Sequence, residues 1–537
     1  MKAGRLLDAS SARALEFAWL RDALAPASSY GDRVFERCEP FLPGEETLAQ
    51  KRADRIAKIA GTYHAPVLDA AREVFRNVPD AAGAIARASM GDALSDANLL
   101  ELQRFFDACE RIDALFASGG LVAPLAPGAV REGARALELG RAGSFGFYLS
   151  DAFDAGLAAA RSAHAAAQAE YDAVRGRASA AIANLLGREI SGSEFIVMRA
   201  DLAGPLPPGV RVIREAPTYV LCELDADEAT LAALERRDAA ANAVAHAEEA
   251  VRARLSQVIA ERAAALDAAC ERFGELDVLV AAARFTQAHG AHAPRIVPEP
   301  ALSFTRGTFV PLAIELAREG RAFTPIDVDL DGVAVLTGPN MGGKSVCLRT
   351  CGFVALCAAF GVPVPAREST VGLFQEIAWL GAGSGDEPGG LLSSFAREVV
   401  RLRDLLGRVS GPACVLLDEF ARTTTPREGR ALLVAVIERL QALRARGLAA
   451  THLDGVAESA GVRHFAVRGL RGIPERPAAS SLAAALEILG ASMDYTIVEV
   501  ADDGRAGADA IALAALLGLD DTLTSAAYAA LDGDGRG

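Results

Sequence analysis

Positive charge is scarce in this sequence of 537 residues, and almost all of it comes from arginine. Lysine occurs only at positions 2, 51, 58 and 344, and 70 acidic residues outnumber 55 basic ones, which gives a net charge of −15. Such a balance argues against a chain that coats nucleic acid non-specifically, because that kind of binding depends on neutralising phosphates. A basic face on one part of the surface is still compatible with it.

Long apolar runs and closely paired cysteines are also missing. No uninterrupted apolar stretch is long enough to cross a bilayer, and the N-terminal residues MKAGRLLDASS lack the apolar core of a signal peptide. The eight cysteines are scattered without a C-x-x-C pair, which favours buried reduced thiols over a metal site. We therefore expect a cytoplasmic protein with no membrane partner.

The composition is globular, and the patterns divide the chain into three parts. Hydrophobic residues make up 51% and charged residues 23% of a chain long enough for two to four domains. Residues 1–125 show helical periodicity with Pro/Gly/Ser breaks. Residues 126–290 contain two long helical patterns, 152–186 and 226–273, separated by two β-like runs, 194–200 and 210–224. Strand and helix patterns alternate over residues 291–537.

The two long helices and the β-like segment between them predict a lever arm with a tip. One helix runs out, a small module at about residues 188–224 follows, and a second helix runs back. A coiled-coil insertion that merely spaces two domains is the alternative interpretation. The predicted fold class is α + α/β: a helical core, long lever helices with a small β clamp, and a wound α/β domain.

The α/β part contains a glycine-rich loop between a strand and a helix. The apolar run 333–336 predicts a buried strand, the next residues fit G-x-x-x-x-G-K-[ST], and an apolar helical pattern follows at once. The loop consists of Gly338, Pro339, Asn340, Met341, Gly342, Gly343, Lys344 and Ser345. Its glycines allow backbone N–H groups to point at phosphate oxygens, and the helix directs its positive end at them. Lys344 can reach the β- and γ-phosphates and Ser345 can ligate Mg²⁺, so the loop predicts binding of a nucleoside triphosphate.

A second apolar strand pattern, 413–417, ends in two acids, Asp418 and Glu419. In phosphoryl-transfer sites the first acid after such a strand holds magnesium. The adjacent Glu419 can orient and deprotonate the attacking water. His452 follows another apolar strand, where its imidazole could face the γ-phosphate.

A glycine-rich segment, 381–398, leads into a helix that begins near Ser393 or Ser394. Serines at such a position usually cap the helix. They can equally offer hydroxyls and the positive end of the helix to a phosphate from another subunit.

With these four elements in order, the chain resembles the ATPase domain of the MutS family, the DNA mismatch-repair clamps of the ABC ATPase superfamily. The resemblance rests on GPNMGGKS, SSFARE, LLDEFARTTTPREG and ATH, with V-P-A at 364–366. It is best over residues 301–519, weaker over the lever and clamp, and faint before 125.

The resemblance implies a P-loop (ABC-type) ATPase that uses ATP and Mg²⁺. It assigns catalytic roles to Lys344, Glu419 and His452, and metal binding to Ser345 and Asp418. It also implies a head-to-tail homodimer with two composite ATP sites. The loop that reaches the partner subunit's ATP matches Ser393, Ser394, Phe395 and Glu398.

Two departures from the family pattern bear on the partner. Too few residues precede the lever for the family's mismatch-recognition domain, and the tip at 188–224 has four arginines against five acids. A surface that grips DNA phosphates should be clearly basic. The family implies an ATP-switched clamp for mismatched or branched DNA. The departures favour the alternative, a MutS-related chaperone or reactivase that acts on a protein client such as a cobalamin-dependent aminomutase.

Overall fold

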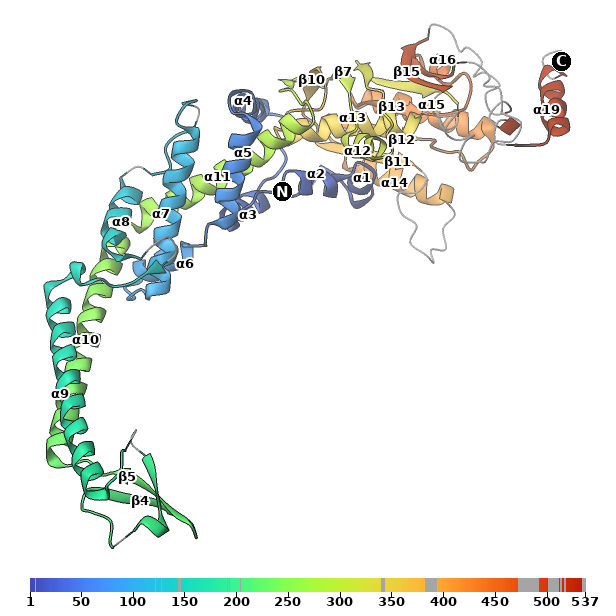
Figure 1. Cartoon of the computed structure of the whole chain (residues 1–537). Coiled ribbons are helices and arrows are strands. Elements are labelled where there is room, and N and C mark those ends of the chain that lie inside the picture. The colour runs from blue at the N-terminus through green and yellow to red at the C-terminus, as the bar shows by residue number, and fades with distance from the viewer. Residues whose placement is uncertain are drawn as a thin grey trace. The chain divides into compact units, whose positions relative to one another are not determined.

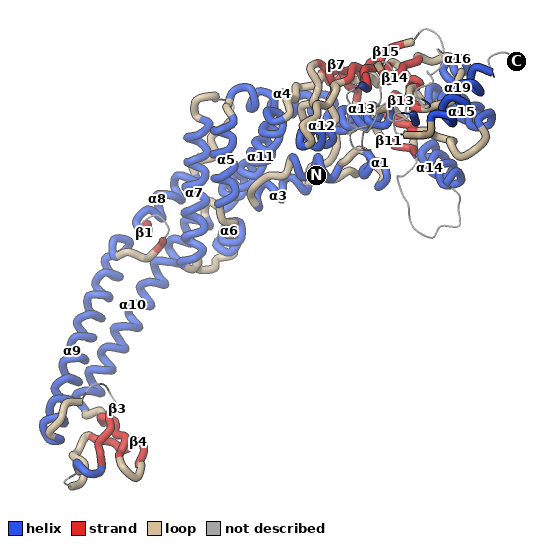
Figure 2. Tube along the Cα trace, turned by 45° about the vertical axis from the view of Figure 1, so that its right-hand side comes forward, coloured by secondary structure: helices blue, strands red, loops and turns tan. Residues whose placement is uncertain are grey.

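A computed structural model gives the fold of the chain (Figures 1 and 2). It describes residues 1–4, 6–120, 122–126, 128–142, 146–190, 192, 194–202, 204–339, 343–381, 394–471, 492–500, 511, 514–515 and 518–533. The chain forms two compact units, which consist of residues 1–77, 114–123 and 271–537 in the first and 78–113 and 124–270 in the second. The mixture of helices and sheets agrees with the predicted α + α/β class. The three-part division into domains stays a prediction.

Two long helices dominate the second unit. Helices α9 (Ala155–Leu186) and α10 (Glu228–Ala260) run side by side in both views (Figures 1 and 2). Ion pairs join them, for example Arg161 Nη2 to Glu248 Oε1 at 2.8 Å. The first predicted helix is confirmed, whereas the predicted helix 226–273 is interrupted after α10, and a separate helix α11 runs from Ala263 to Ala288.

The module that connects α9 to α10 is a three-stranded antiparallel sheet in the order β3-β5-β4. The strands are β3 (Glu194–Met198), β4 (Val210–Glu215) and β5 (Tyr219–Leu224). The predicted β-like run 210–224 is therefore a hairpin of two strands. Its small core consists of Ile182, Phe195, Val197, Val220 and Cys222.

The other elements that lie wholly or mainly in the second unit are helical or very short. The helices are α6 (Ala82–Ser89), α7 (Asp96–Phe116) and α8 (Ala129–Leu137). The short strands are β1 (Arg141–Ala142) and β2 (Gly146–Phe147), and 3-10 turns occur at Glu138–Gly140, Asp151–Phe153 and Arg199–Asp201.

The first unit contains a six-stranded sheet in the order β11-β12-β13-β9-β14-β15. All neighbouring strands are parallel except β14 and β15. The strands are β9 (Val333–Thr337), β11 (Glu376–Gly381), β12 (Ala413–Asp418), β13 (Arg446–Ala450), β14 (His464–Leu470) and β15 (Met493–Glu499). The strands predicted at 333–336 and 413–417 are confirmed within one or two residues as β9 and β12.

The helices that follow these strands are α13 (Lys344–Ala359), α14 (Ser394–Arg408), α15 (Pro426–Ala442) and α16 (Val456–Ala460). Helix α13 is buried along almost its whole length, which explains its nearly uniform apolar sequence. Side chains of α14 and α15 form one core with strands β12 and β13.

A second sheet of the first unit has the order β6-β10-β7-β8. Its strands are β6 (Arg295–Val297), β7 (Leu302–Gly307), β8 (Ile326–Leu330) and β10 (Glu368–Gly372). Residues 288–300, whose Pro and Gly content is typical of a linker, therefore contribute a strand. Strand β6 is only three residues long, and its pairing with β10 bridges more than seventy residues of sequence.

The remaining helices of the first unit are α1 (Ala9–Ala14), α2 (Phe17–Ala23), α3 (Ser29–Glu36), α4 (Glu46–Thr62), α5 (Ala65–Asn77), α12 (Val310–Arg318) and α19 (Asp521–Gly533). The N-terminal segment covers the edge strand β11. Leu6 O accepts a 2.7 Å hydrogen bond from the N–H of Ile377, and Ser11 Oγ accepts one of 2.9 Å from Trp379 N–H. The sheet edge is thereby paired within the chain.

Among the described residues, no helix has the length and the apolar character that crossing a membrane requires. The cytoplasmic location stays a prediction.

Candidate nucleotide-binding site

A glycine turn connects β9 to α13. Gly338 has φ +147° and Gly343 has φ +88°, a backbone region that favours glycine. A Cβ on Gly338 would lie 3.0 Å from Val467 Cβ, and one on Gly343 would lie 3.2 Å from Tyr495 Cδ1. Neighbouring strands thus leave little room for a side chain. Asn340, Met341 and Gly342 lie outside the described residues.

Lys344 is the first residue of α13 and is buried, with 6% of its surface exposed. Its ammonium Nζ donates to the carbonyl oxygens of Gly338 at 2.8 Å and Pro339 at 3.1 Å. Burial lowers the pKa of Lys344, against the opposing charges of Glu419 and Asp418. The ammonium therefore lies inside the turn, where phosphate oxygens can replace the two carbonyls as its partners.

Strand β12 brings Asp418 to the first turn of α13. Ser345 Oγ donates a 2.9 Å hydrogen bond to Asp418 Oδ1. Asp418 is opposite Ala450 of β13, and Ala450 is opposite Leu336 of β9, so three neighbouring strands end in one row. Burial raises the pKa of Asp418, and the Ser345 hydrogen bond acts against this shift. A carboxylate and a hydroxyl in contact are the oxygen ligands that Mg²⁺ prefers, so the pair fits this ion.

Glu419 has left-handed backbone, with φ +53°, and its N–H donates to Ala450 O at 2.9 Å. Its Oε2 accepts a 2.7 Å hydrogen bond from Arg422 Nη1. Burial acts to raise the pKa of Glu419, but the Arg422 hydrogen bond and the charges of Lys344, Arg422 and His452 together lower it. The carboxylate is therefore ionised at neutral pH and engaged by a guanidinium that sequence reasoning had not singled out.

His452 lies two residues after the end of β13 and is exposed. The preceding Thr451 is buried, and its N–H donates to Leu336 O at 3.0 Å, which fixes the backbone beside β9. The charge of His452 contributes to lowering the pKa of Glu419.

Of the glycine-rich segment 381–398, the structure describes only residue 381 and residues 394–398. Ser393 lies outside the described residues, and only the backbone of Ser394 is described, as the first residue of α14. One turn later Glu398 is buried, and its Oε2 accepts a 3.0 Å hydrogen bond from Ala421 N–H.

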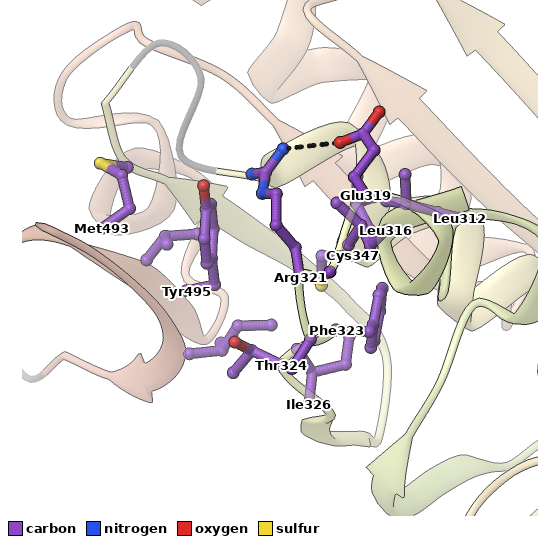
Figure 3. Close-up of a pocket in the computed structure, with 16 residues that line it drawn as sticks. Leu312, Leu316, Glu319, Arg321, Phe323, Thr324, Ile326, Cys347, Met493 and Tyr495 are labelled. Atoms are coloured by element: carbon purple, nitrogen blue, oxygen red, sulfur yellow. Dashed lines mark hydrogen bonds and ion pairs between the residues drawn. The ribbon is translucent and has the colours of Figure 1, made fainter. Parts of the chain in front are cut away.

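A cavity of about 850 Å³ opens beside the turn and includes Gly343 in its wall. Figure 3 shows Tyr495, from β15, on one side and Phe323, from the segment before β8, on the other. Arg321 pairs with Glu319 at 3.2 Å. Sequence reasoning missed this cavity, because Phe323 and Tyr495 are far apart in the chain and neither belongs to a motif. The cavity has the size and apolar lining of a small-molecule site.

The first unit thus combines a parallel sheet with a glycine turn, a buried lysine and two acids at neighbouring strand ends. A family model described as MutS domain V matches residues 334–469, which include all of these groups. The "Endonuclease MutS2" of Pelotomaculum thermopropionicum is 35% identical over 206 residues, which make up 37% of this chain and 25% of the relative.

Two proteins named "DNA mismatch repair protein MutS" are also similar. The protein of Paracoccus denitrificans is 33% identical over 211 residues, 38% of this chain and 24% of the relative. The protein of Granulibacter bethesdensis is 31% identical over 264 residues, 47% of this chain and 28% of the relative. Residues 334–469 of the chain therefore form a domain of the MutS domain V family. The match spans about a quarter of the length of these relatives.

Proposed function

We propose that the chain binds ATP with Mg²⁺ and hydrolyses it at the site formed by Lys344, Ser345, Asp418 and Glu419. The observation that carries this proposal is the 2.9 Å contact between Ser345 and Asp418 at the row of strand ends where Lys344 is also buried. A chance glycine turn or an ordinary helix cap does not explain a buried lysine and two acids at one helix N-terminus. Membership of the MutS family supports the same conclusion.

The chemistry follows from the positions of the side chains. Lys344 exchanges its two carbonyl partners for oxygens of the β- and γ-phosphates. Ser345 and Asp418 would hold Mg²⁺, which when bound neutralises charge on the phosphate oxygens. Glu419 orients the attacking water and accepts its proton. Because Arg422 now occupies the Glu419 carboxylate, that ion pair must shift before water takes its place.

The cavity beside Gly343 is proposed to bind the adenine base. Its lining combines aromatic and aliphatic side chains, among them Phe323, Tyr495 and Leu316. A flat purine ring gains from stacking on aromatic faces and from leaving water. The position of the cavity next to the phosphate turn fits a nucleotide that spans both.

Assembly as a homodimer with composite sites is also part of the proposal. Its support is the match of residues 393–398 to the family's signature loop. In such a dimer the hydroxyls of Ser393 and Ser394 would bind the nucleotide of the other subunit.

The similar proteins are named for DNA mismatch repair or as endonucleases, and on this ground we propose that the lever and clamp engage mismatched or branched DNA. One observation favours the second candidate, a protein client such as a cobalamin-dependent aminomutase. Within the tip, Arg199 pairs with Glu215 at 2.5 Å, and Arg211 pairs with Glu223. Arginines already paired with acids offer little to DNA phosphates.

The proposal is tested by measuring ATP binding and phosphate release by the parent protein and by the Lys344→Ala variant. Lys344→Ala should weaken ATP binding by about 100-fold or more, because it removes the ammonium that lies inside the turn. Lys58→Ala, a change of an exposed lysine on α4 in the same unit, is the matched control and should behave as the parent. Parental binding and hydrolysis in Lys344→Ala would contradict the proposal.

A further inference from the structure

One carboxylate near the site belongs neither to the turn nor to the acid pair. Glu398 lies on the second turn of α14, is 6% exposed, and accepts the 3.0 Å hydrogen bond from Ala421 N–H. Burial raises the pKa of Glu398, while the bond from Ala421 and the charges of Arg401 and Arg422 act in the other direction. The family pattern matches Glu398 to a loop that reaches a partner subunit, but its carboxylate points into its own chain.

The N–H that Glu398 binds belongs to a loop with unusual backbone. Glu419 and Ala421 have φ +53° and +61°, values that residues other than glycine rarely adopt. Such conformations persist only where the surrounding structure fixes them. At Glu419 the N–H is fixed by Ala450 O, and at Ala421 it is fixed by Glu398.

Packing holds the other side of the same loop. A Cβ on Gly429 of α15 would lie 3.1 Å from Ala421 O, so the carbonyl rests directly on the helix. Phe420 and Ala421 are 2% and 1% exposed. The direction in which the Glu419 side chain leaves the backbone therefore depends on contacts at Ala421. Arg422, which binds the Glu419 carboxylate, is carried by the same loop.

Filling space does not explain a carboxylate at this position. Burying a charged group is costly, and an apolar side chain would fill the same volume without that cost. Helix α14 is already anchored in the core by Leu402 and Leu405. What Glu398 adds is an acceptor for one particular N–H in the loop of the proposed base.

We propose that Glu398 is a positioning residue for Glu419. By accepting the Ala421 N–H it fixes the two left-handed residues of the loop, and it thereby sets where the Glu419 carboxylate meets the attacking water. This inference rests on the proposed ATP hydrolysis at this site. Hydrolysis, but not ATP binding, then depends on the hydrogen bond that Glu398 of α14 accepts from Ala421 N–H.

The test compares Glu398→Ala, Glu398→Gln and Val399→Ala in the full chain. Val399 is the next residue on α14 and is 41% exposed, so its change is the matched control. In single turnovers at saturating ATP, Glu398→Ala should slow hydrolysis by about 10- to 100-fold, with ATP affinity within about twofold of the parent. Glu398→Gln should stay within about threefold of the parental rate, because an amide oxygen accepts the same hydrogen bond.

A double variant separates positioning from general stability. Because Glu398 acts through Glu419, Glu398→Ala should cause no further loss in a Glu419→Gln background. The inference would be overturned by an equal further loss of rate in the Glu419→Gln background. It would also be overturned if Glu398→Ala hydrolysed ATP at the parental rate, or if it lost ATP affinity instead of rate. So would a Gln variant as slow as the Ala variant. A parent that hydrolyses ATP no faster than Lys344→Ala would show instead that the proposed function fails, and this inference with it.

Discussion

The packing of the N-terminal segment against α13 allows a stability change to be calculated in advance. Leu15 is fully buried and faces Gly352. A Cβ on Gly352 would overlap Leu15 Cδ2 and would lie 2.8 Å from Leu416 Cδ1. Overpacking of this kind costs about 1–3 kcal/mol, and alanine recovers about 1 kcal/mol through its helix propensity. Gly352→Ala should therefore lower the free energy of unfolding by up to about 2 kcal/mol.

Leu15→Ala removes the atom that the new methyl group would overlap. Alone it should cost about 2–5 kcal/mol, the usual range for truncating a buried leucine. In the double variant the methyl group on Gly352 enters part of the vacated space. The cost of Gly352→Ala should then fall, because only the close contact with Leu416 Cδ1 remains, which corresponds to a coupling of about 1 kcal/mol or more.

Urea denaturation of the four proteins measures this coupling. The chain has two tryptophans, Trp19 and Trp379, and both belong to the first unit, so their fluorescence reports its unfolding. Strict additivity of the two single changes would show that the N-terminal segment does not pack on α13 as described.

Two further predictions concern assembly and the partner. If Ser393 and Ser394 act on the partner's nucleotide, a protein with both serines changed to Ala should hydrolyse ATP poorly. Mixing it with Lys344→Ala protein should restore activity. A mixture whose activity equals the sum of the two separate variants would contradict shared sites. Because Arg199 and Arg211 are paired with acids, duplex DNA should bind no better than micromolar at physiological salt. Titrations of homoduplex, mismatched and four-way-junction DNA at two salt concentrations test this, with log K expected to fall by about 0.9 per phosphate contact for each unit of log salt. Nanomolar, structure-selective binding would exclude the protein-client alternative.

Local patterns predicted much of the fold, because the signals lie within single elements. The strand β9, the glycine turn and α13 are consecutive in sequence, and so are β12 and its two acids. Helix α9 is identifiable from its periodicity alone. The hairpin of β4 and β5 was predicted as one run, since the turn at residues 216–218 is only three residues long.

Contacts between distant parts of the chain could not be predicted in the same way. Nothing in the sequence around Ser11 indicates that its hydroxyl accepts a hydrogen bond from Trp379 N–H. The strands β7, β8 and β10 are five or six residues long, and their pairing joins segments far apart in sequence. The Arg422–Glu419 pair is local, but it occurs in a loop whose left-handed backbone at Glu419 is not indicated by the residue type.

Single-turnover hydrolysis by Glu419→Gln is the most direct test of the central claim that this site hydrolyses ATP. The variant keeps the shape of the side chain but cannot accept a proton from water. ATP affinity should stay close to that of the parent, and the hydrolysis rate should fall by about 100-fold or more. Glu438→Gln, an equivalent change at an exposed glutamate of α15, should leave both quantities unchanged. A parental rate in Glu419→Gln would show that Glu419 is not the base and would contradict the account.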